Sequence, residues 1–351
     1  MRLLILTQKI DQNDPILGFF HRWVIEFAKY FEQVMVVSLG VGEYHTPPNV
    51  RVRSLGKECG VSRLRYLLNF YRYLWRERNS YDVVFVHMNP LYVILGGLVW
   101  RLLNKKIGLW YTHKHTDVKL WLAEKLSHFI FTASAESFRL PSKKVSIVGH
   151  GIDTERFAPA ATEPQNGLRI ITVGRISPVK RYEVLIEAIG VLKGEGVSSK
   201  TIIIGDTVTG LDREYFETIK ALVDDKQLDD IVEFRGAVPH SALPEHLNRA
   251  TVFVNMSETG SLDKAVLEAM ACGVPAVTSN EAFASVFGAE RNILMFPKGD
   301  ARGLAQKIKT LQDFDIEKRH ELSKKLRNII VEHHNLEKLI LKISQTYEAG
   351  R

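Results

Sequence analysis

The sequence predicts an α/β protein built from two domains, each with a parallel β-sheet. Short apolar runs alternate with segments of helical periodicity along most of the chain, which is the pattern of strands joined by crossover helices. The length of 351 residues suits two domains of ordinary size. Residues 158–167 have the composition of a linker and separate two such alternating series. We therefore expect the domain boundary there.

The first series opens with an apolar run, Met1–Leu6, that is too short for a signal-peptide core and leads into polar residues. We interpret it as a buried strand. Strands are expected near 2–7, 33–38, 82–87, 107–112, 128–133 and 145–148. Helices are expected near 18–31, 62–78, 90–104 and 117–126.

The second series follows the linker and has the same alternation. Strands are expected near 168–173, 200–204, 231–235, 251–254, 274–278 and 292–296, and helices near 181–194, 212–227, 241–248, 263–272 and 301–312. A charged helical segment, about 316–348, follows. We assign residues 1–160 to the first domain, 161–330 to the second and 331–351 to a terminal helix.

The charge is unevenly distributed. The formal net charge is +7; residues 1–165 contain 22 Lys and Arg against 14 Asp and Glu, whereas the remainder contains 25 against 26. A basic first half indicates an anionic partner, either nucleic acid, an acidic membrane surface or a phosphorylated substrate. No stretch reaches the ~18 apolar residues needed to span a bilayer. The two cysteines are expected to be reduced thiols in a cytosolic protein.

Residues 62–78 are basic, aromatic and amphipathic. Such a helix can lie in a membrane interface. The alternative is a helix that packs its apolar face on the first sheet and keeps its arginines in water. The two interpretations are compatible, and our hypothesis is that this segment docks the protein on an anionic leaflet.

The segment 173–181 follows the first strand of the second domain and opens a helix. Gly174 lets the backbone approach a ligand, and Arg175 and Lys180 put two cations beside a helix N-terminus, which favours anions. The pattern indicates a diphosphate site that needs no metal. A solvated basic loop is the alternative when the segment is taken alone.

The segment 260–277 contains a carboxylate within an apolar helix. The helix is expected to begin at Ser261 or Asp263 and to end at Cys272, with Gly273 as a left-handed cap. Glu268 lies in its interior, where a carboxylate is unfavourable unless something pairs with it. The two hydroxyls of a ribose would be suitable partners because an ionised carboxylate only accepts hydrogen bonds.

Two other classes of site are disfavoured. No Cys/His cluster has the spacing of a zinc site. No Gly-x-Gly-x-x-Gly follows an expected strand, which argues against a nicotinamide-dependent dehydrogenase.

Arg175, Lys180 and the sequence Glu-Ala-Met-Ala-Cys-Gly-Val-Pro-Ala-Val that begins at Glu268 resemble the donor half of the family 4 glycosyltransferases, which are retaining enzymes of the GT-B fold. The similarity extends to residues 148–157, 234–239 and 292–300, and it is looser in the first half. The resemblance implies two Rossmann-like domains whose parallel sheets face each other across a cleft. It also implies that the terminal helix, 331–351, crosses back to the first domain.

The resemblance further implies a nucleotide-diphosphate sugar as donor substrate, held in the second domain without a metal or other cofactor. Arg175 and Lys180 would hold the diphosphate and offset charge on the leaving group, with Gly174 beside them, and Glu268 would accept from the ribose. Arg235 and Gly236 match the loop beside the nucleotide base.

In the first domain, Gly18 matches a glycine loop that borders the donor phosphates or the acceptor. His113 matches a strand-end histidine near the reacting sugar, and a histidine there can titrate near neutral pH or donate to a sugar oxygen. Without the resemblance, a lone histidine at a strand end is more often a structural residue.

One departure from the family pattern concerns the donor sugar. The family often has a second glutamate eight residues before the one that matches Glu268, where this chain has Gly260. The segment 259–264 offers backbone N–H groups of Gly260 and Ser261, and the side chains of Asp263 and Lys264, for the same ligand. A plain helix cap is the alternative for Asp263.

We therefore expect a retaining glycosyltransferase that moves a hexose-type sugar to an acceptor hydroxyl in surface polysaccharide or glycolipid assembly. The expected partners are the nucleotide sugar, a glycan or lipid-linked acceptor and an anionic membrane surface, but no nucleic acid. The expected location is the cytoplasm, at the inner face of the cell membrane. A sugar-nucleotide epimerase of the same fold and a non-catalytic nucleotide-sugar-binding protein are the alternatives.

Overall fold

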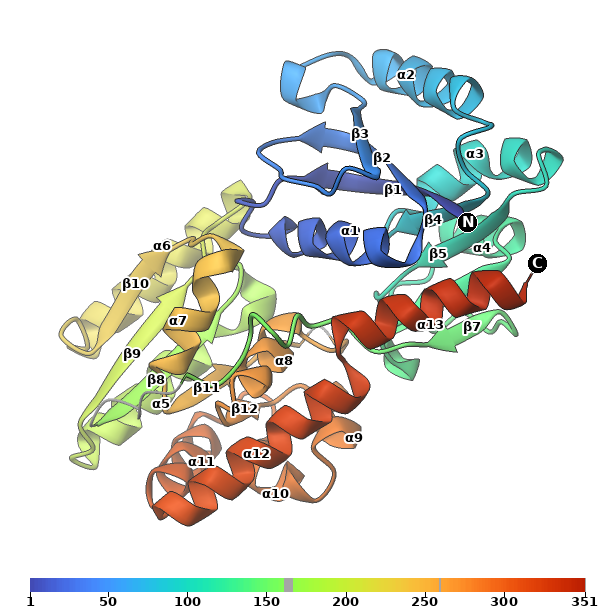
Figure 1. Ribbon diagram of the computed structural model, residues 1–351. Coiled ribbons are helices and arrows are strands. Elements are labelled where there is room, and N and C mark those ends of the chain that lie inside the picture. The colour runs from blue at the N-terminus through green and yellow to red at the C-terminus, as the bar shows by residue number, and fades with distance from the viewer. Residues whose placement is uncertain (161–166, 259, 351) are drawn as a thin grey trace. The chain divides into compact units, whose positions relative to one another are not determined.

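The computed structural model of the protein describes residues 1–160, 167–258 and 260–350 (Figure 1). The chain divides into two compact units. Unit 1 comprises Met1–Asp153, Pro239–Ser241 and His334–Arg351, and unit 2 comprises Thr154–Val238 and Ala242–His333. Most of the expected linker, residues 161–166, lies outside the described residues, as does Thr259 of the segment expected to replace the early glutamate.

Unit 1 is built on a seven-stranded parallel sheet (sheet 1) with the order β3-β2-β1-β4-β5-β6-β7. The strands are β1 (Arg2–Ile10), β2 (Gln33–Val41), β3 (Val50–Ser54), β4 (Val83–His87), β5 (Lys106–Trp110), β6 (Phe129–Thr132) and β7 (Val145–Ile147). Successive side chains of β1 point to opposite faces. Leu3 and Ile5 therefore join one core cluster, and Leu4 and Leu6 join the other.

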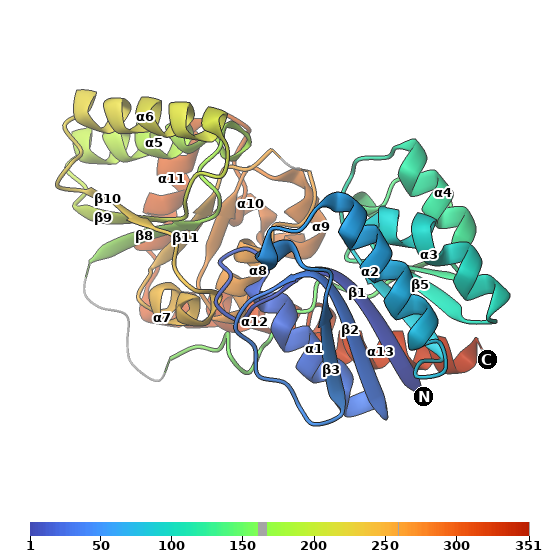
Figure 2. The same ribbon diagram turned by 90° about the horizontal axis from the view of Figure 1, so that it is seen from above.

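Helices cover both faces of this sheet. The helices of unit 1 are α1 (Gly18–Tyr30), α2 (Arg63–Arg76), α3 (Pro90–Leu102), α4 (Val118–Leu126) and α13 (Leu336–Ala349). α1 and α13 pack together on the face of Leu3 and Ile5. α2, α3 and α4 cover the face of Leu4 and Leu6 (Figure 2). The expected segment 62–78 is thus a helix that packs one face on the first sheet.

Unit 2 contains a five-stranded parallel sheet (sheet 2) with the order β10-β9-β8-β11-β12. The strands are β8 (Leu168–Val173), β9 (Ser199–Ile204), β10 (Val232–Gly236), β11 (Val252–Asn255) and β12 (Ala276–Thr278). The helices are α5 (Tyr182–Gly194), α6 (Gly210–Asp225), α7 (Leu243–Asn248), α8 (Lys264–Ala271), α9 (Ala284–Phe287), α10 (Arg291–Leu294), α11 (Ala301–Gln312) and α12 (Ile316–His333). α5 packs with α6 and α11, and α8 packs with α12 and α7.

The two parallel sheets confirm the predicted α/β class, and some elements differ from expectation. β3 was not predicted; it alternates apolar Val50 and Val52 with arginines at an edge of sheet 1. The strand expected at 292–296 is wrong: α10 ends at Leu294, and only an isolated bridge joins Met295 to Thr278. A short apolar run fits a buried helix as well as a strand.

The charged segment expected over 316–348 is two helices, α12 and α13. The side chain of Asn335 accepts a hydrogen bond from the backbone N–H of Lys338 at 2.9 Å and so caps α13. The division between the units also falls here, because α12 belongs to unit 2 and α13 to unit 1.

Candidate functional site

Glycines allow close approach of the loops that follow β8 and β9. Gly205 has φ +149°, and a Cβ atom there would lie 1.9 Å from the carbonyl oxygen of Gly174, which itself has φ +156°. Only glycine fits such a contact. The backbone N–H of Gly205 donates to the carbonyl of Gly236 at the end of β10. The carboxyl ends of the three strands are therefore joined by backbone, at the edge of a parallel sheet where ligands usually bind.

Lys180 stands beside Gly174. It ends a short 3₁₀ turn, Pro178–Lys180, and its Nζ would be 3.6 Å from a Cβ atom at Gly174. Tyr182, the first residue of α5, donates from its hydroxyl to the Gly174 carbonyl at 2.9 Å. Burial, and after it the charge of Asp263, raises the pKa of Tyr182 well above its ordinary value, so the hydroxyl keeps its proton. Arg175 lies in the same loop and is exposed.

An ion pair connects this loop to the start of α8. Lys180 Nζ lies 2.8 Å from Asp263 Oδ1, and the two side chains are only 17% and 16% exposed. Asp263 also accepts from Asn255 Nδ2 at 3.0 Å, and Asn255 accepts from the hydroxyl of Thr278 at 2.9 Å. Asn255 and Thr278 end the neighbouring strands β11 and β12, so the ion pair lies at the carboxyl ends of these two strands.

The alternative of Asp263 as a plain helix cap is wrong. It occupies the N-cap position of α8, but its side chain makes no capping hydrogen bond. Burial raises its pKa, while the charge of Lys180 and hydrogen bonds from Lys180, Asn255 and Ser257 lower it by more, so the net shift is downward. Asp263 is therefore an ionised group whose oxygens are directed at Lys180 and Asn255.

Glu268 is buried one turn further along α8. Lys264 Nζ lies 3.9 Å from Glu268 Oε1, in the i, i+4 relation of a helical ion pair. The first turns of α8 thus carry two cation–carboxylate pairs, with Lys180 and Lys264 as cations. Gly273 ends the helix in the predicted left-handed conformation, with φ +75°.

The segment before α8 lies against the 3₁₀ turn that contains Lys180. The backbone N–H of Glu258 donates to the carbonyl of Val179 at 3.1 Å. Gly260 has φ +66°, and the carbonyl of Ser261 accepts from Asn280 Nδ2 at 2.8 Å. Gly260 and Ser261, whose backbone N–H groups were expected to face the ligand, therefore lie on the same side of sheet 2 as Lys180, near the carboxyl ends of its strands.

The other predicted residues lie on β10 or in unit 1. Arg235, on the edge strand β10, pairs with Glu233 at 2.6 Å and contacts His246 Nδ1 at 3.3 Å. His113 and Gly18 belong to unit 1. His113 is exposed beyond the end of β5, and partial desolvation and then the nearby His115 lower its pKa.

Gly18 begins α1 and is closely packed, since a Cβ atom there would lie 3.1 Å from the carbonyl oxygen of Gln12, closer than an ordinary van der Waals contact. The structure thus brings together Gly174, Lys180, Gly260, Ser261, Asp263, Lys264 and Glu268, with Arg175 in the same loop as Gly174 and Lys180.

The sequence reasoning missed Asn255 and Tyr182. Asn255 is a polar residue at the end of the buried run Val252–Asn255, directly beyond which ligands of a parallel sheet bind. That position was the available signal. Tyr182 gave none, because an aromatic residue at the start of a helix is more often part of the core.

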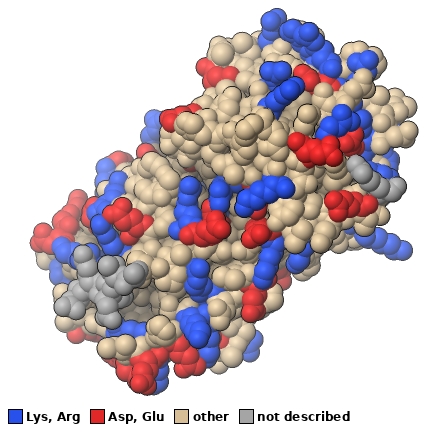
Figure 3. All heavy atoms as spheres, in the orientation of Figure 1, with Lys and Arg blue, Asp and Glu red and all other residues tan. Residues whose placement is uncertain are grey.

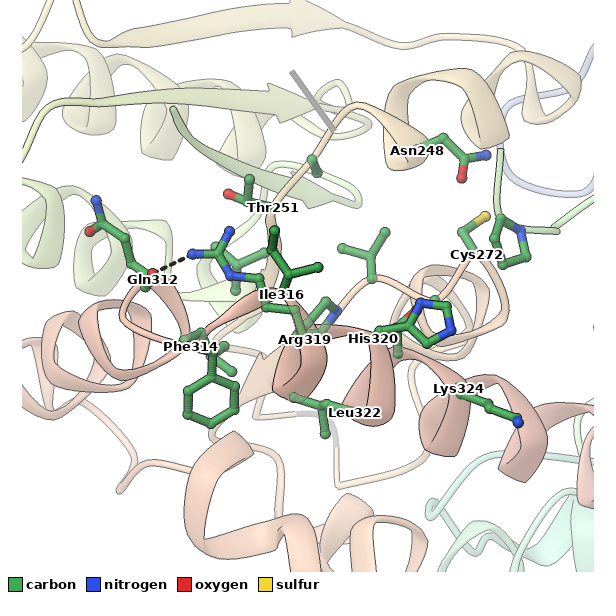
Figure 4. Close-up of a pocket in the computed structure, with 18 of the residues that line it drawn as sticks. Asn248, Thr251, Cys272, Gln312, Phe314, Ile316, Arg319, His320, Leu322 and Lys324 are labelled. Atoms are coloured by element: carbon green, nitrogen blue, oxygen red, sulfur yellow. Dashed lines mark hydrogen bonds between the residues drawn. The ribbon is translucent and has the colours of Figure 1, made fainter. Parts of the chain in front are cut away.

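A separate pocket of about 850 Å³ opens near the amino ends of β8 and β11 (Figure 4). Its lining includes Thr251 from the sheet side and Ile316, Arg319 and His320 from α12. Arg319 donates to the backbone carbonyl of Gln312. The predicted donor residues are not among its lining residues. The pocket lies at the amino ends of the strands of sheet 2, whereas the two ion pairs lie on the side of their carboxyl ends.

Among the described residues, no helix is both long enough and apolar enough to cross a membrane.

The family model of glycosyl transferases group 1 matches residues 153–329. WcaL of Escherichia coli strain K12, named as a colanic acid biosynthesis glycosyltransferase, is 29% identical over 217 residues, which are 60% of this chain and 52% of that protein. AmsK of Erwinia amylovora, the amylovoran biosynthesis glycosyltransferase, is 30% identical over 177 residues, or 47% and 41% of the two chains. The chain spans about half the length of the curated relatives it matches.

The fold is also that of solved structures. Anabaena Alr3699/HepE in complex with UDP superposes with a TM-score of 0.80 at 17% identity, covering 99% of this chain and 100% of that one. Sucrose-phosphate synthase from Thermosynechococcus elongatus gives a TM-score of 0.79 at 18% identity, with 99% of each chain covered. These similarities confirm the predicted fold class, GT-B with two Rossmann-like domains.

Proposed function

Because the chain belongs to the family of glycosyl transferases group 1, we propose that it is a retaining glycosyltransferase that moves a hexose-type sugar from a nucleotide-diphosphate sugar to an acceptor hydroxyl. Two ion pairs near the carboxyl ends of β8 and β11 carry the proposal. They are Lys180–Asp263 and Lys264–Glu268. Both lie where a parallel sheet binds its ligands.

The diphosphate binds at Arg175 and Lys180 in this proposal. A phosphate that leaves from the sugar gains negative charge in the transition state, and cations fixed at that point stabilise it. Arg175 is exposed at the end of β8, and Lys180 is held beside Gly174. The positive charge for the leaving group thus comes from side chains.

Glu268 binds the ribose in this proposal. A buried carboxylate needs strong partners, and Glu268 Oε1 lies 3.9 Å from Lys264 Nζ. Two ribose hydroxyls can donate to it at full strength.

Asp263 takes the place of the missing early glutamate as a positioning residue for Lys180. Asn255 and Ser257 hold its carboxylate from the sheet side, so Lys180 is fixed in one orientation before the donor arrives. A lysine side chain that is already ordered loses little rotamer entropy on binding the diphosphate. Gly260 and Ser261 contribute backbone N–H groups to the same ligand.

The acceptor is proposed to be a glycan or lipid-linked sugar, in surface polysaccharide or glycolipid assembly at the cytoplasmic face of the cell membrane. The names of WcaL and AmsK, which refer to colanic acid and amylovoran, support this class. In unit 1, His113 is proposed to donate to or accept from an oxygen of the transferred sugar. Its lowered pKa favours the neutral imidazole at pH 7, which can do either.

A donor screen tests the proposal. The full chain is titrated with UDP-, GDP- and ADP-sugars, and its melting temperature is followed, since a ligand of the folded state raises stability with the logarithm of its concentration. We expect one nucleotide series to raise the melting temperature of the wild type and to have little effect on the Lys180→Met and Glu268→Gln variants. Equal stabilisation of the wild type and both variants would place the nucleotide elsewhere.

A further inference from the structure

Three neighbouring helices of unit 1 carry a second apolar surface that the fold does not bury. Phe70 and Leu74 of α2 and Tyr92, Val93 and Trp100 of α3 already fill the core against sheet 1. A helix at the surface of a domain normally has one apolar face, directed at the core. Apolar residues on the outward faces of α2, α3 and α4 therefore need another explanation.

The outward residues of α2 and α3 follow the same spacing. On α2 they are Leu64, Leu68, Tyr71 and Trp75, and on α3 they are Leu91, Leu98 and Leu102; Leu95, between them on α3, is half-buried and also packs against the core. Positions i, i+4, i+7 and i+11 lie on one side of a helix. Leu64, Leu98 and Leu102 are 66%, 66% and 85% exposed. Each helix thus presents a stripe of large apolar side chains to the outside, parallel to its buried face.

The stripes are neighbours and extend onto α4. The hydroxyl of Tyr71 donates to the carbonyl of Leu95 at 3.0 Å, which joins the α2 stripe to the α3 stripe. α3 and α4 pack closely at Gly97, where a Cβ atom would lie 3.0 Å from Leu126 Cδ1. Val118, Trp121 and Leu122 continue the exposed apolar residues on α4.

We call this the three-helix surface. It contains ten of the eighteen large hydrophobic residues that are exposed in the described part of the chain, although its helices span less than a fifth of the sequence. Such a concentration marks an interaction surface rather than scattered exposure.

Basic residues border the three-helix surface. α2 contains Arg63, Arg65, Arg72 and Arg76 and no acidic residue, and the spacing places Arg65, Arg72 and Arg76 along one flank of its stripe. Within the three helices the one acidic residue is Glu124, whose side chain is buried against Ser142 and Lys144. In Figure 3, Lys and Arg atoms lie along the upper edge, where Figure 1 shows α2.

Two tryptophans of the surface lie under cations. The guanidinium of Arg78 is 4.7 Å from the ring centre of Trp75, and Lys125 Nζ is 5.9 Å from the ring of Trp121. Tryptophan with a cation above it suits the boundary between water and lipid headgroups, where one end is apolar and the other is wet.

We propose that the three-helix surface docks on an anionic lipid bilayer, with its leucines and tryptophans in the acyl boundary and its arginines among the headgroups. The positive charge of the basic flank favours an anionic bilayer over a second copy of the chain as the binding partner. A symmetric dimer through this surface would bring the same basic flank against itself, whereas anionic headgroups neutralise it. The inference extends the proposed function to the place where a lipid-linked acceptor would be met, but it needs no donor.

Vesicle co-sedimentation tests the inference. The full chain is mixed with phosphatidylcholine vesicles, with and without phosphatidylglycerol, at low and high salt and without any nucleotide sugar. We expect binding only with phosphatidylglycerol and much less of it at high salt. The variant Arg65→Gln/Arg72→Gln/Arg76→Gln should lower the partition coefficient about 100-fold, since each basic residue near the surface contributes roughly fivefold. Trp75→Ser/Leu98→Ser/Trp121→Ser should lower it at least about tenfold.

Matched controls lie in unit 2. Leu211→Ser/Ile316→Ser removes exposed apolar residues, and Arg302→Gln/Lys318→Gln/Lys324→Gln removes three exposed cations, from elsewhere on the chain. Both controls should bind like the wild type. The inference is overturned if the wild type does not bind phosphatidylglycerol vesicles at low salt, or if the controls lose as much binding as the surface variants.

A dimer in light scattering that Trp75→Ser/Leu98→Ser/Trp121→Ser dissociates would instead assign the surface to a second copy. The donor melting shift, measured on the same variants, should not change. The melting shift therefore tests the proposed donor site, and vesicle binding tests the docking surface, independently of each other.

Discussion

Replacing Lys180 by methionine should separate a structural role from a catalytic one. The substitution removes the charge and keeps most of the side-chain volume. Asp263 then remains as a carboxylate 16% exposed, with hydrogen bonds from Asn255 and Ser257 but without its cation. Removing one partner of a buried ion pair lowers a protein's unfolding free energy by about 3–5 kcal/mol. Because both side chains retain some exposure and Asp263 keeps other donors, we expect Lys180→Met to lower the unfolding free energy by about 2–3 kcal/mol.

The double variant Lys180→Met/Asp263→Asn should recover most of that loss, because it removes the stranded charge and leaves a neutral amide that Asn255 and Ser257 can still contact. We expect it within about 1 kcal/mol of the wild type. Turnover should not recover. If Lys180 stabilises charge on the leaving diphosphate, both variants should transfer sugar about 100-fold more slowly than the wild type.

Arg175→Met is the matched control for a cation that is exposed rather than paired. We expect its unfolding free energy within about 0.5 kcal/mol of the wild type and its turnover about 100-fold lower. The measurements are urea unfolding at pH 7, followed by circular dichroism, and the rate of donor consumption with acceptor present. A double variant that regains both stability and turnover would refute the reasoning, since Lys180 would then act only through the fold.

Three further predictions concern other parts of the molecule. Glu268→Gln should weaken donor binding at least about tenfold, and it should abolish the preference for a ribose over a 2′-deoxyribose donor in calorimetric titrations; a variant that still discriminates would assign the ribose to another group. Gly205→Ala should lower the unfolding free energy by about 2 kcal/mol or more, because its Cβ would meet the Gly174 carbonyl, whereas Gly194→Ala, with open space around it, should not. Burial, and after it nearby cations, lowers the pKa of His128 to about 4, so its stabilisation is complete above the unfolded pKa of ~6.5 and is lost as the pH falls toward 4. Between pH 7 and pH 4 the unfolding free energy of the wild type, measured in urea, should fall by about 2 kcal/mol through this group, and this fall should be absent in His128→Asn. The same dependence of unfolding free energy on pH in both proteins would contradict the lowered pKa.

The alternation of apolar runs and helical segments was sufficient to predict both sheets, because parallel strands joined by helices leave that pattern over the whole chain. It failed where a segment was short. The run at 292–296 contains four apolar residues in succession, Ile293–Phe296, and such a run fits a helix or a strand equally well. β3 was overlooked because the arginines on its exposed side mask the alternation of Val50 and Val52.

The candidate site was predictable as a set of residues but not as a set of contacts. Arg175, Lys180 and Glu268 stand in local motifs that can be found in the sequence. The pairing of Lys180 with Asp263 depends on two loops 83 residues apart that meet only because β8 and β11 are neighbours in the sheet. From sequence alone, an aspartate before a helix indicates a cap, and only the fold reveals that its side chain turns to Lys180 instead.

A crystal structure of the full chain with its nucleotide tests the account most directly. We expect density for the diphosphate within hydrogen-bonding distance of Lys180 and Arg175, and the ribose hydroxyls on Glu268. A nucleotide bound in the pocket beside α12, or one whose diphosphate and ribose contact neither Lys180 nor Glu268, would contradict it.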